Sequence, residues 1–379
     1  MSVRPATSAA ELKLFIRLPR LLYRGLPGFV PPLDLERRNL LHPKHAPFFR
    51  RGRAQFFLCF RGTEPVGRIS AHVDPLAVER WGAPIGLFGA LDAVDDPDVV
   101  SVLLDAACAW LRAEGMQRVR GPYALSPNDE AGLLVEGERE RPMLLSPWHP
   151  GYLGPLVEAA GLRKVKDLVS YDLAIGPDAE RALPITRARL MESAHGEGIT
   201  VRRLRPKQIA EDAAIMGRLY NDAWTDNWGF IPITEPDVAA MVKELKPLIR
   251  PEYLVLVERV GEPLGFALVL PNIYDAVDDL GGAPSPLGWL RLAWRMQRHR
   301  FRSGRVILLG ISDSLRNTTL GALMPSMIIA ELMKRGRDTP LRSVELGWIL
   351  EDNTRIRRLI ERMAPKPNKV FRLYERSLV

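Results

Sequence analysis

Apolar residues form nearly continuous runs in two similar stretches of the chain, at 54–74 and 252–272. Each stretch is rich in β-branched and aromatic residues and is interrupted by a short Gly/Pro segment, so each predicts two strands joined by a tight turn. The two stretches share the pattern Glu-Pro-x-Gly, which starts at Glu64 and at Glu262, an offset of 198 residues. The pattern therefore indicates an internal repeat of one β-hairpin.

The same order of elements follows each hairpin. A strand, a helix and a further strand are predicted at 85–88, 98–114 and 117–121 in the first half, and at 305–311, 321–335 and 343–349 in the second. Gly115 and Gly336 stand just beyond the two predicted helices, where glycine commonly supplies a left-handed cap. This order predicts an α/β fold of two tandem domains, each with a mixed central sheet flanked by helices.

Helical sequence precedes each hairpin. Its periodicity predicts helices at 9–24, 206–224 and 235–248. Thr234 begins the last of these with a capping-box pattern and a proline in the first turn. Turn-forming residues flank a polar segment between the halves. We therefore predict an N-terminal domain, a linker helix and a C-terminal domain, at 1–177, 178–198 and 199–379.

The composition is that of an ordinary globular protein, because 46% of the residues are hydrophobic and 26% are charged. No stretch approaches the ~18 apolar residues that span a bilayer, and the first residues lack the apolar core of a signal peptide. We therefore expect a cytoplasmic location. Cys59 and Cys108 have no Cys or His partners at metal-ligand spacing, so neither a disulfide nor a metal site is expected.

The net charge of +8 is concentrated in one segment, 286–305, which holds six arginines and no acidic residue. At helical spacing this segment predicts a basic amphipathic helix at 286–302, inserted between the second hairpin and the next strand. Its arginine stripe and its tryptophans, Trp289 and Trp294, suit a membrane interface, which would make the protein peripheral on the inner face of the cytoplasmic membrane. The alternative is a helix that packs on the protein with solvated arginines.

A possible anion site follows the predicted strand at 305–311. At such a strand-to-helix turn, unpaired backbone N–H groups and the positive end of the helix dipole meet. Here the chain resembles the GNAT acetyltransferase superfamily, whose pyrophosphate loop reads Gln/Arg-x-x-Gly-x-Gly/Ala. Arg316 fits the first position and Gly321 the last, but Thr319 replaces the first glycine. The alternative is that Gly321 starts a tightly packed helix and Arg316 is a surface charge.

The resemblance implies acyl-CoA as co-substrate. Asn353 corresponds to the superfamily asparagine that follows the fifth strand, although a helix N-cap explains it equally well. The implied cofactor residues are Ile311, Arg316, Asn317, Thr319, Gly321, Ala322 and Asn353. The matching turn of the first half carries four aspartates, Asp92, Asp95, Asp96 and Asp98. Because these would repel phosphate, we predict a degenerate N-terminal domain that serves as a substrate-side wall.

Three residues are candidates for the proton transfers of acyl transfer. Glu345 is an isolated acid in an apolar strand, and acts either as a base or as a paired structural acid. Glu351 stands at the strand end, where it is either a base or a cap of the next helix. In the superfamily, a tyrosine in the last helix often protonates the leaving thiolate, and the matching position here is Ile360. Tyr374 is therefore considered as a substitute acid. The alternative is that Tyr374 is a core or strand tyrosine.

Loops rich in polar and aromatic residues are the candidates for acceptor binding, because such loops often line pockets. One joins the two helices before the second hairpin, and the others lie in the first half. The residues singled out are Asn221, Trp224, Asn227, Trp228, Asn128 and Tyr152.

The whole chain resembles a family of long tandem-GNAT proteins that contains bacterial ceramide synthases. The resemblance rests on Phe29-Val-Pro-Pro32, Val66-Gly-Arg-Ile69, Gly121-Pro122, Gly132-Leu-Leu-Val-Glu136, Asn227-Trp-Gly-Phe230, Trp348-Ile-Leu-Glu-Asp-Asn353 and Arg372-Leu-Tyr374. It implies transfer of an acyl group from acyl-CoA to the amine of a sphingoid base, giving (dihydro)ceramide, with no nucleic-acid partner. Two alternatives stay open: transfer from aminoacyl-tRNA, and a non-catalytic membrane- or RNA-binding protein with a decayed GNAT site.

Overall fold

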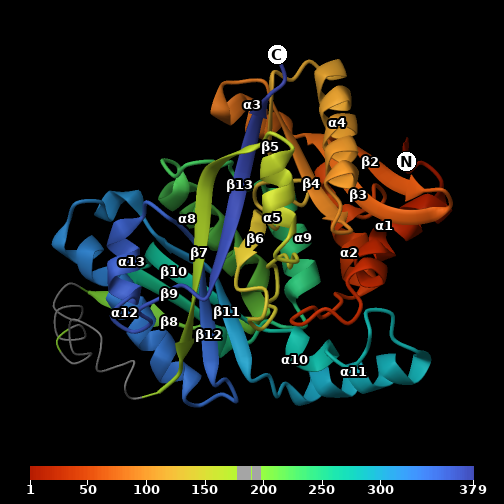
Figure 1. Cartoon of the computed structure of the whole chain (residues 1–379). Coiled ribbons are helices and arrows are strands. Elements are labelled where there is room, and N and C mark those ends of the chain that lie inside the picture. Colours follow the sequence, from red (N-terminus) through yellow and green to blue (C-terminus); the bar gives the residue numbers. More distant parts are fainter. Residues whose placement is uncertain (177–188, 190–197) are drawn as a thin grey trace.

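The structure is a computed structural model that describes residues 1–176, 189 and 198–379 (Figure 1). The predicted linker helix at 178–198 therefore lies outside the described residues, except for residues 189 and 198. The division into domains at 1–177 and 199–379 remains a prediction.

The described strands join in one 13-stranded sheet. They are β1 (Ser2–Pro5), β2 (Arg53–Arg61), β3 (Glu64–Val73), β4 (Ile85–Ala93), β5 (Arg118–Gly121), β6 (Leu133–Glu136), β7 (Arg163–Ala174), β8 (Ile199–Arg202), β9 (Leu254–Arg259), β10 (Glu262–Pro271), β11 (Ser303–Ile311), β12 (Ser343–Leu350) and β13 (Lys369–Ser377).

Helices lie on both faces of this sheet. The α-helices are α1 (Ala9–Leu22), α2 (Asp34–Leu41), α3 (Pro75–Trp81), α4 (Pro97–Ala113), α5 (Leu153–Ala159), α8 (Ile209–Trp224), α9 (Glu235–Leu245), α10 (Tyr274–Val277), α11 (Pro286–Arg298), α12 (Thr319–Gly336) and α13 (Thr354–Ile360). Short 3₁₀ helices are η1 (Pro47–Arg50), η2 (Pro206–Gln208), η3 (Pro251–Tyr253) and η4 (Asp313–Leu315).

The predicted repeat is confirmed, since β2–β3 and β9–β10 are antiparallel hairpins. Their turn glycines are Gly62 and Gly261, which have positive φ angles of 61° and 82° that favour glycine. The Glu-Pro-x-Gly motifs come after the turns, at the start of β3 and β10, and each coincides with a register shift. Proline has no N–H for the ladder, so the shared motif marks a bulge after the turn and not the turn itself.

Two of three helix-end signals are confirmed. Thr234 forms the predicted capping box with Asp237, and Gly115 beyond α4 has a φ of 82°. Gly336 was expected to cap its helix in the left-handed conformation, and this expectation is wrong. Gly336 is the last helical residue of α12, where its lack of a side chain leaves room for Ile175.

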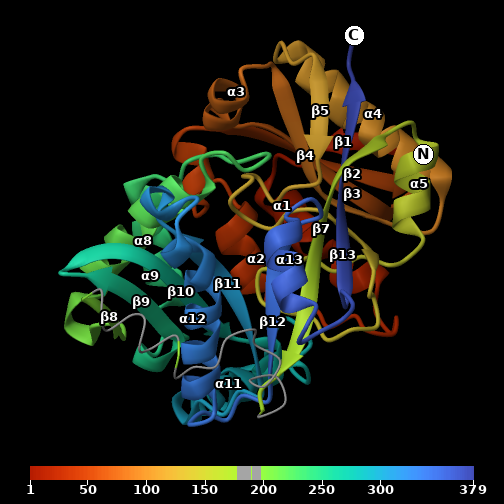
Figure 2. The ribbon, with the colours of Figure 1, turned by 90° about the vertical axis from the view of Figure 1, so that its left-hand side faces the viewer.

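Strand side chains alternate between two helical layers. In β2, Phe57 and Cys59 pack in the core that contains α4, whereas Phe56 and Leu58 pack in the core that contains α1. The same alternation places β9 between α12 and α8. Figure 2 shows α12 and α13 in front of the strands of the second half. This period of two is why both hairpins read as nearly continuous apolar runs.

The two halves exchange strands. The order in the sheet is β1-β2-β3-β4-β5-β13-β7-β12-β11-β10-β9-β8. The last strand of the chain, β13, therefore pairs with β5, and the last described strand of the first half, β7, pairs with β12. Two GNAT-like sheets are thus joined edge to edge into one, a connection that the repeat alone did not predict.

The basic helix is shorter than predicted. It was expected at 286–302, but α11 ends at Arg298 because His299 adopts a left-handed conformation. Leu292 and Met296 pack against the core of the second half, while Arg291 and Arg295 pair with Asp279. No helix of the described residues is both long and apolar enough to cross a membrane.

Because β13 connects both halves, we predict that Phe371→Ala lowers the unfolding free energy of the whole molecule in one transition. Phe371 is fully buried, and truncating such a side chain costs about 3–5 kcal/mol. Urea unfolding followed by circular dichroism measures the change. Leu290→Ala, at a side chain that is 68% exposed, serves as the control and should change stability by less than about 0.5 kcal/mol. Two separate transitions, of which only one shifts, would contradict the prediction.

Candidate functional site

The candidate site lies where two parallel strands separate. β11 and β12 pair from Ser303 with Ser343 up to Val306 with Leu346, and their register ends there. A cavity of about 710 Å³ is lined by the residues of both strands beyond this point. The carboxyl ends of parallel strands are the usual place for a ligand in such sheets. The separation of β11 from β12 therefore creates an opening at the usual ligand position of the second half.

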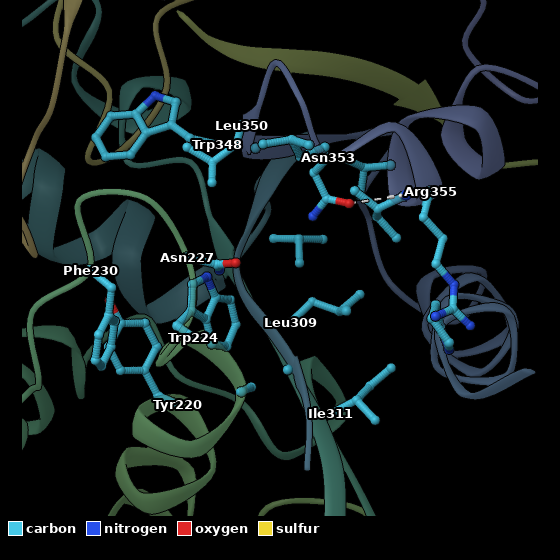
Figure 3. A pocket seen from close by; sticks show the side chains of 18 of the residues that line it. Tyr220, Trp224, Asn227, Phe230, Leu309, Ile311, Trp348, Leu350, Asn353 and Arg355 are labelled. Carbon is cyan, nitrogen blue, oxygen red and sulfur yellow. Dashed lines mark hydrogen bonds between the residues drawn. The ribbon is translucent and has the colours of Figure 1, made fainter. Parts of the chain in front are cut away.

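The cavity is bounded by elements from both halves (Figure 3). Tyr220, Trp224 and Phe230 lie on one side, Asn353 and Arg355 on the opposite side, with the β11 side chains between them. The residues contributed by the first half and by β13 are Tyr123, Pro127, Asn128, Ala131, Leu168 and Leu373.

The charge of the lining is strongly positive. It includes four arginines, Arg316, Arg355, Arg358 and Arg362, whereas Asp313 is the one carboxylate among the described lining residues. The first turn of α12 also borders the cavity, and its backbone N–H groups carry the positive end of the helix dipole. This arrangement suits a ligand with several negative charges, such as the phosphates of a nucleotide cofactor.

Of the seven predicted cofactor residues, five line the cavity: Ile311, Arg316, Gly321, Ala322 and Asn353. Asn317 and Thr319 do not belong to this lining. Asn317 has a left-handed φ of 64°, and Thr319 is the first residue of α12, which Thr318 caps by accepting a hydrogen bond from the Gly321 N–H.

Gly321 has a packing reason to be glycine. A Cβ atom at this position would stand 2.1 Å from the carbonyl oxygen of Leu315, so η4 can approach α12 only if no side chain is present. This observation favours the alternative that Gly321 starts a tightly packed helix, and it is compatible with a ligand beside the same turn. Arg316 forms ion pairs with Asp226 and Asp313, so it is held at the rim of the cavity.

Asn353 combines both of its predicted roles. Its side-chain oxygen accepts a hydrogen bond from the Ile356 N–H at 3.4 Å, which caps α13, and the residue also lines the cavity. Ile360, at the position of the superfamily tyrosine, is a lining residue too. An aliphatic side chain therefore occupies the place where the resemblance implies an acid.

The predicted acceptor residues are divided. Trp224, Asn227, Trp228 and Asn128 line the cavity. Asn221 instead fixes the loop that carries Asn227 and Trp228. Its side-chain oxygen accepts a hydrogen bond from the Ile233 N–H at 2.8 Å, and its side-chain nitrogen donates one to the Ile233 carbonyl at 3.0 Å.

Tyr152 lies outside the cavity lining. Its hydroxyl donates a hydrogen bond to the carbonyl of Ala93 at 2.8 Å, within the first half.

None of the three catalytic candidates lines the cavity. Glu345 is fully buried on β12, where it pairs with Lys369 at 2.5 Å and with Arg305 at 3.5 Å. Burial lowers the pKa of Lys369, and the carboxylate of Glu345 opposes that shift. Arg305 also stacks on Trp348 and donates to the carbonyl of Leu144. The surroundings of Glu345 favour the alternative of a paired structural acid.

Glu351 and Tyr374 also have structural partners. Glu351 pairs with Lys164 at 2.7 Å and accepts a hydrogen bond from the Asp167 N–H. Tyr374 is fully buried in β13, and its hydroxyl donates to Glu158 at 3.2 Å. Burial, reinforced by Glu158, raises the pKa of Tyr374, so its proton is held tightly.

Several cavity residues were missed from the sequence. Tyr220 stacks on Trp224 at 4.8 Å and donates a hydrogen bond to Asn128 at 2.9 Å, which joins α8 to the first half. An aromatic pair at i, i+4 could have indicated this contact. Arg355, Arg358 and Arg362 recur at helical spacing in and beyond α13, a stripe that was as visible as the one in α11.

Asp129 lies in one of the polar loops considered for acceptor binding but was not singled out as a site residue. It follows the lining residue Asn128, and burial, together with the charges of Asp237 and Glu130, raises its pKa to about 8. A carboxyl group that titrates near neutral pH is suited to proton transfer. Its cationic neighbour is Arg51, which is paired with Asp74 and Asp237.

The first half has a much smaller opening at its matching strands, a cavity of about 90 Å³ whose lining includes Ala90, Asp92 and Tyr123. The parallel ladder of β4 and β5 is extended by a hydrogen bond from the Tyr123 N–H to the Phe88 carbonyl at 2.8 Å. Asp92 is paired with Arg68, and Asp96 caps α4 while pairing with Arg61. Two of the four aspartates of the predicted acidic turn are thus paired with arginines of the same half.

Comparison with known proteins gives full-length relatives. The bacterial ceramide synthase of Caulobacter vibrioides is 36% identical over 383 residues, covering 100% of this chain and 98% of its own length. Protein YghO of Escherichia coli is 33% identical over 381 residues, covering 99% of this chain and 95% of its own. No family model matches the chain.

Solved structures confirm the predicted tandem GNAT fold. A tandem GNAT protein from the clavulanic acid biosynthesis pathway matches with a TM-score of 0.60 at 12% identity, covering 100% of this chain and 98% of its own. A GCN5-related N-acetyltransferase from Anabaena variabilis matches with a TM-score of 0.53 at 9% identity, covering 100% of this chain and 73% of its own. At these identities the likeness shows the fold alone.

We predict that Glu345→Gln lowers the unfolding free energy by about 3 kcal/mol, because it leaves Lys369 and Arg305 buried without their counter-charge. Chemical denaturation measures the loss. Glu351→Gln is the matched control: its ion pair is partly exposed, so the same change should cost less than about 1 kcal/mol. If Glu345→Gln were as stable as the wild type but slower in turnover, Glu345 would act as a base after all.

Proposed function

Because the chain belongs to the bacterial ceramide synthase family, we propose that it is an N-acyltransferase that moves an acyl group from acyl-CoA to the amine of a sphingoid base. The product is a (dihydro)ceramide. The observation that carries this proposal is the single cavity in which a basic rim meets an apolar interior at the separation of β11 from β12. The rim suits the phosphates of coenzyme A, and the interior suits an alkyl chain.

The donor is proposed to enter with its pyrophosphate at the first turn of α12. Backbone N–H groups of that turn and the side chain of Arg316 supply donors there. Arg358 and Arg362 line the same cavity and add positive charge. Neutralising several phosphate charges at one rim orients the donor before the acceptor arrives.

The acceptor is proposed to approach past Trp224, Asn227 and Trp228, which line the cavity beside α8. Its amine nitrogen attacks the thioester carbonyl carbon, so a C–N bond forms while the C–S bond breaks. The nitrogen loses one proton, and the departing thiolate gains one. Tyr220 has its hydroxyl on the cavity wall, where burial raises its pKa and the hydroxyl donates to Asn128.

We assign no chemical step to Glu345, Glu351 or Tyr374, because each is bound to other side chains outside the cavity lining. The two alternatives from the sequence predict different behaviour. An enzyme that uses aminoacyl-tRNA would need a charged RNA as donor, and a decayed GNAT protein would bind no acyl-CoA at all.

We further propose that α11 contacts a membrane surface. Leu287, Leu290 and Trp294 are 76%, 68% and 53% exposed, and their spacing of three and four residues places them on one stripe. Arg298 lies over the ring of Trp294. An exposed apolar stripe with arginines beside it fits the interface of an anionic bilayer, where a lipid acceptor would be found.

We predict that Ala322→Glu weakens acyl-CoA binding by about a hundredfold. Ala322 is exposed in the first turn of α12, so the variant should fold, but its carboxylate would face the pyrophosphate. Like charges a few ångströms apart near a protein surface repel by up to about 4 kcal/mol before salt screening. Calorimetric titration measures the affinity, and mass spectrometry of a reaction with a sphingoid base detects the amide product.

Two controls accompany this variant. Ala322→Gln adds similar bulk without charge and should retain most of the affinity. Asp95→Lys, in the corresponding turn of the first half, should leave binding unchanged. If the wild-type protein bound no acyl-CoA, the proposed function would be wrong. If only Asp95→Lys lost acyl-CoA binding, the donor site would lie in the first half.

For the membrane contact, we predict that replacing Leu287, Leu290 and Trp294 together by serine lowers co-sedimentation with phosphatidylglycerol vesicles by at least about tenfold, since each side chain would lose apolar burial in the interface. Val260→Ser is the control, because Val260 is 90% exposed on a distant turn. Unchanged sedimentation of the triple variant would show that α11 is a packing helix.

A further inference from the structure

The cavity extends beyond the two strands that open it. Its lining passes from β11 to β12, then to Leu168 on β7 and Leu373 on β13, which are consecutive strands in the sheet. Leu168 stands opposite Leu350 of β12 in the ladder. The cavity thus leads from the second half of the chain towards the first.

The part of the lining that comes from β7, from β13 and from the turn at Tyr123 and Ala131, here called the inner end, is apolar. Tyr123, Ala131, Leu168 and Leu373 line it and belong to one hydrophobic cluster. They are 3%, 4%, 7% and 2% exposed. A bridge between Tyr123 and Ala131 fixes the turn that supplies two of them. The charged lining residues, by contrast, come from η4, from Arg316 and from the segment 355–362.

A linear ligand with a polyanionic head and an alkyl tail matches this polarity. If the phosphates of acyl-CoA lie at α12, the part of the donor beyond its thioester points away from α12 and along the gap between β11 and β12. The next apolar space in that direction is the inner end. An alkyl chain could also come from the acceptor, whose tail has the same chemistry, so the two sources must be separated by experiment.

We propose that the inner end, formed by Tyr123, Ala131, Leu168 and Leu373, holds the terminal methylenes of the donor's acyl chain. The first half of the chain, together with β13, then sets the acyl length that is transferred. This inference rests on the proposed function and deepens it. It also gives the first half a direct contact with the substrate, although the cavity at its own matching strands is small.

Two variants that change the volume of the inner end in opposite directions test the proposal. Ala131→Leu fills the inner end, and Leu373→Ala enlarges it. Each methylene that loses its apolar contact should weaken binding about fourfold, the equivalent of ~0.8 kcal/mol. Ala131→Leu should therefore weaken the binding of the longest acyl-CoAs by a factor of some tens. The affinity for acetyl-CoA and butyryl-CoA should not change. Leu373→Ala should shift the tightest binding towards longer chains.

Binding is measured by calorimetry over a series of saturated acyl-CoAs, from acetyl to stearoyl, in the absence of amine. Leu134→Ala is the matched control for Leu373→Ala: Leu134 is 2% exposed in the same hydrophobic cluster but lies outside the cavity lining. It should lower stability without changing the dependence on chain length. Circular dichroism confirms that each variant is folded.

A parallel series of sphingoid bases of different tail length, assayed by product formation, identifies the source of the chain. We expect both variants to keep the wild-type preference for the tail length of the sphingoid base. The proposal is overturned if the amine preference shifts instead, or if neither variant alters the acyl preference. If the wild type binds acyl-CoAs with no dependence on length, this inference fails while the proposed function stands. If it binds none, the proposed function itself fails.

Discussion

The pairing of β13 with both β5 and β7 is the interaction on which the rest of the structure depends. It gives each half a strand from the other and converts two open sheet edges into paired ones, which removes the unpaired N–H and C=O groups that an edge exposes. The same pairing buries Lys369 beside Glu345 and brings Leu373 to the cavity. Stability of the sheet and shape of the site therefore come from one contact.

Two halves with the same order of elements can differ in chemistry because their parallel strand pairs end differently. In the second half the parallel ladder of β11 and β12 ends at Val306 and Leu346, so a cavity opens beyond it. In the first half the ladder of β4 and β5 is extended by the Tyr123 N–H, and Asp92 and Asp96 of the acidic turn are paired with Arg68 and Arg61. Strands that stay paired have backbone groups satisfied by each other, and the cavity beside them is about 90 Å³ against about 710 Å³ in the second half.

Local features were predictable from the sequence, and long-range pairings were not. The hairpins and the capping box of Thr234 follow from residue patterns within a few positions, and the structure has them where they were predicted. The exchange of β7 and β13 was missed because strand partners depend on contacts between distant residues, and the repeat carried no signal for them. Glu345 was correctly recognised as an acid that needs a partner, but Lys369 and Arg305 could be identified as its partners only in the folded sheet.

The candidate site shows the same limit. Arg316, Gly321 and Asn353 were found because they follow strand ends, whereas Tyr123, Leu168 and Leu373 look like ordinary core residues in the sequence. They reach the cavity only because exchanged strands place them there. A cavity lined from both halves constrains both: a shift of β13 relative to β7 would move Leu373 and also disturb the buried charges around Glu345. The half with the smaller cavity is therefore tied to the shape of the site, and this coupling accounts physically for a tandem arrangement in which one half has the large opening.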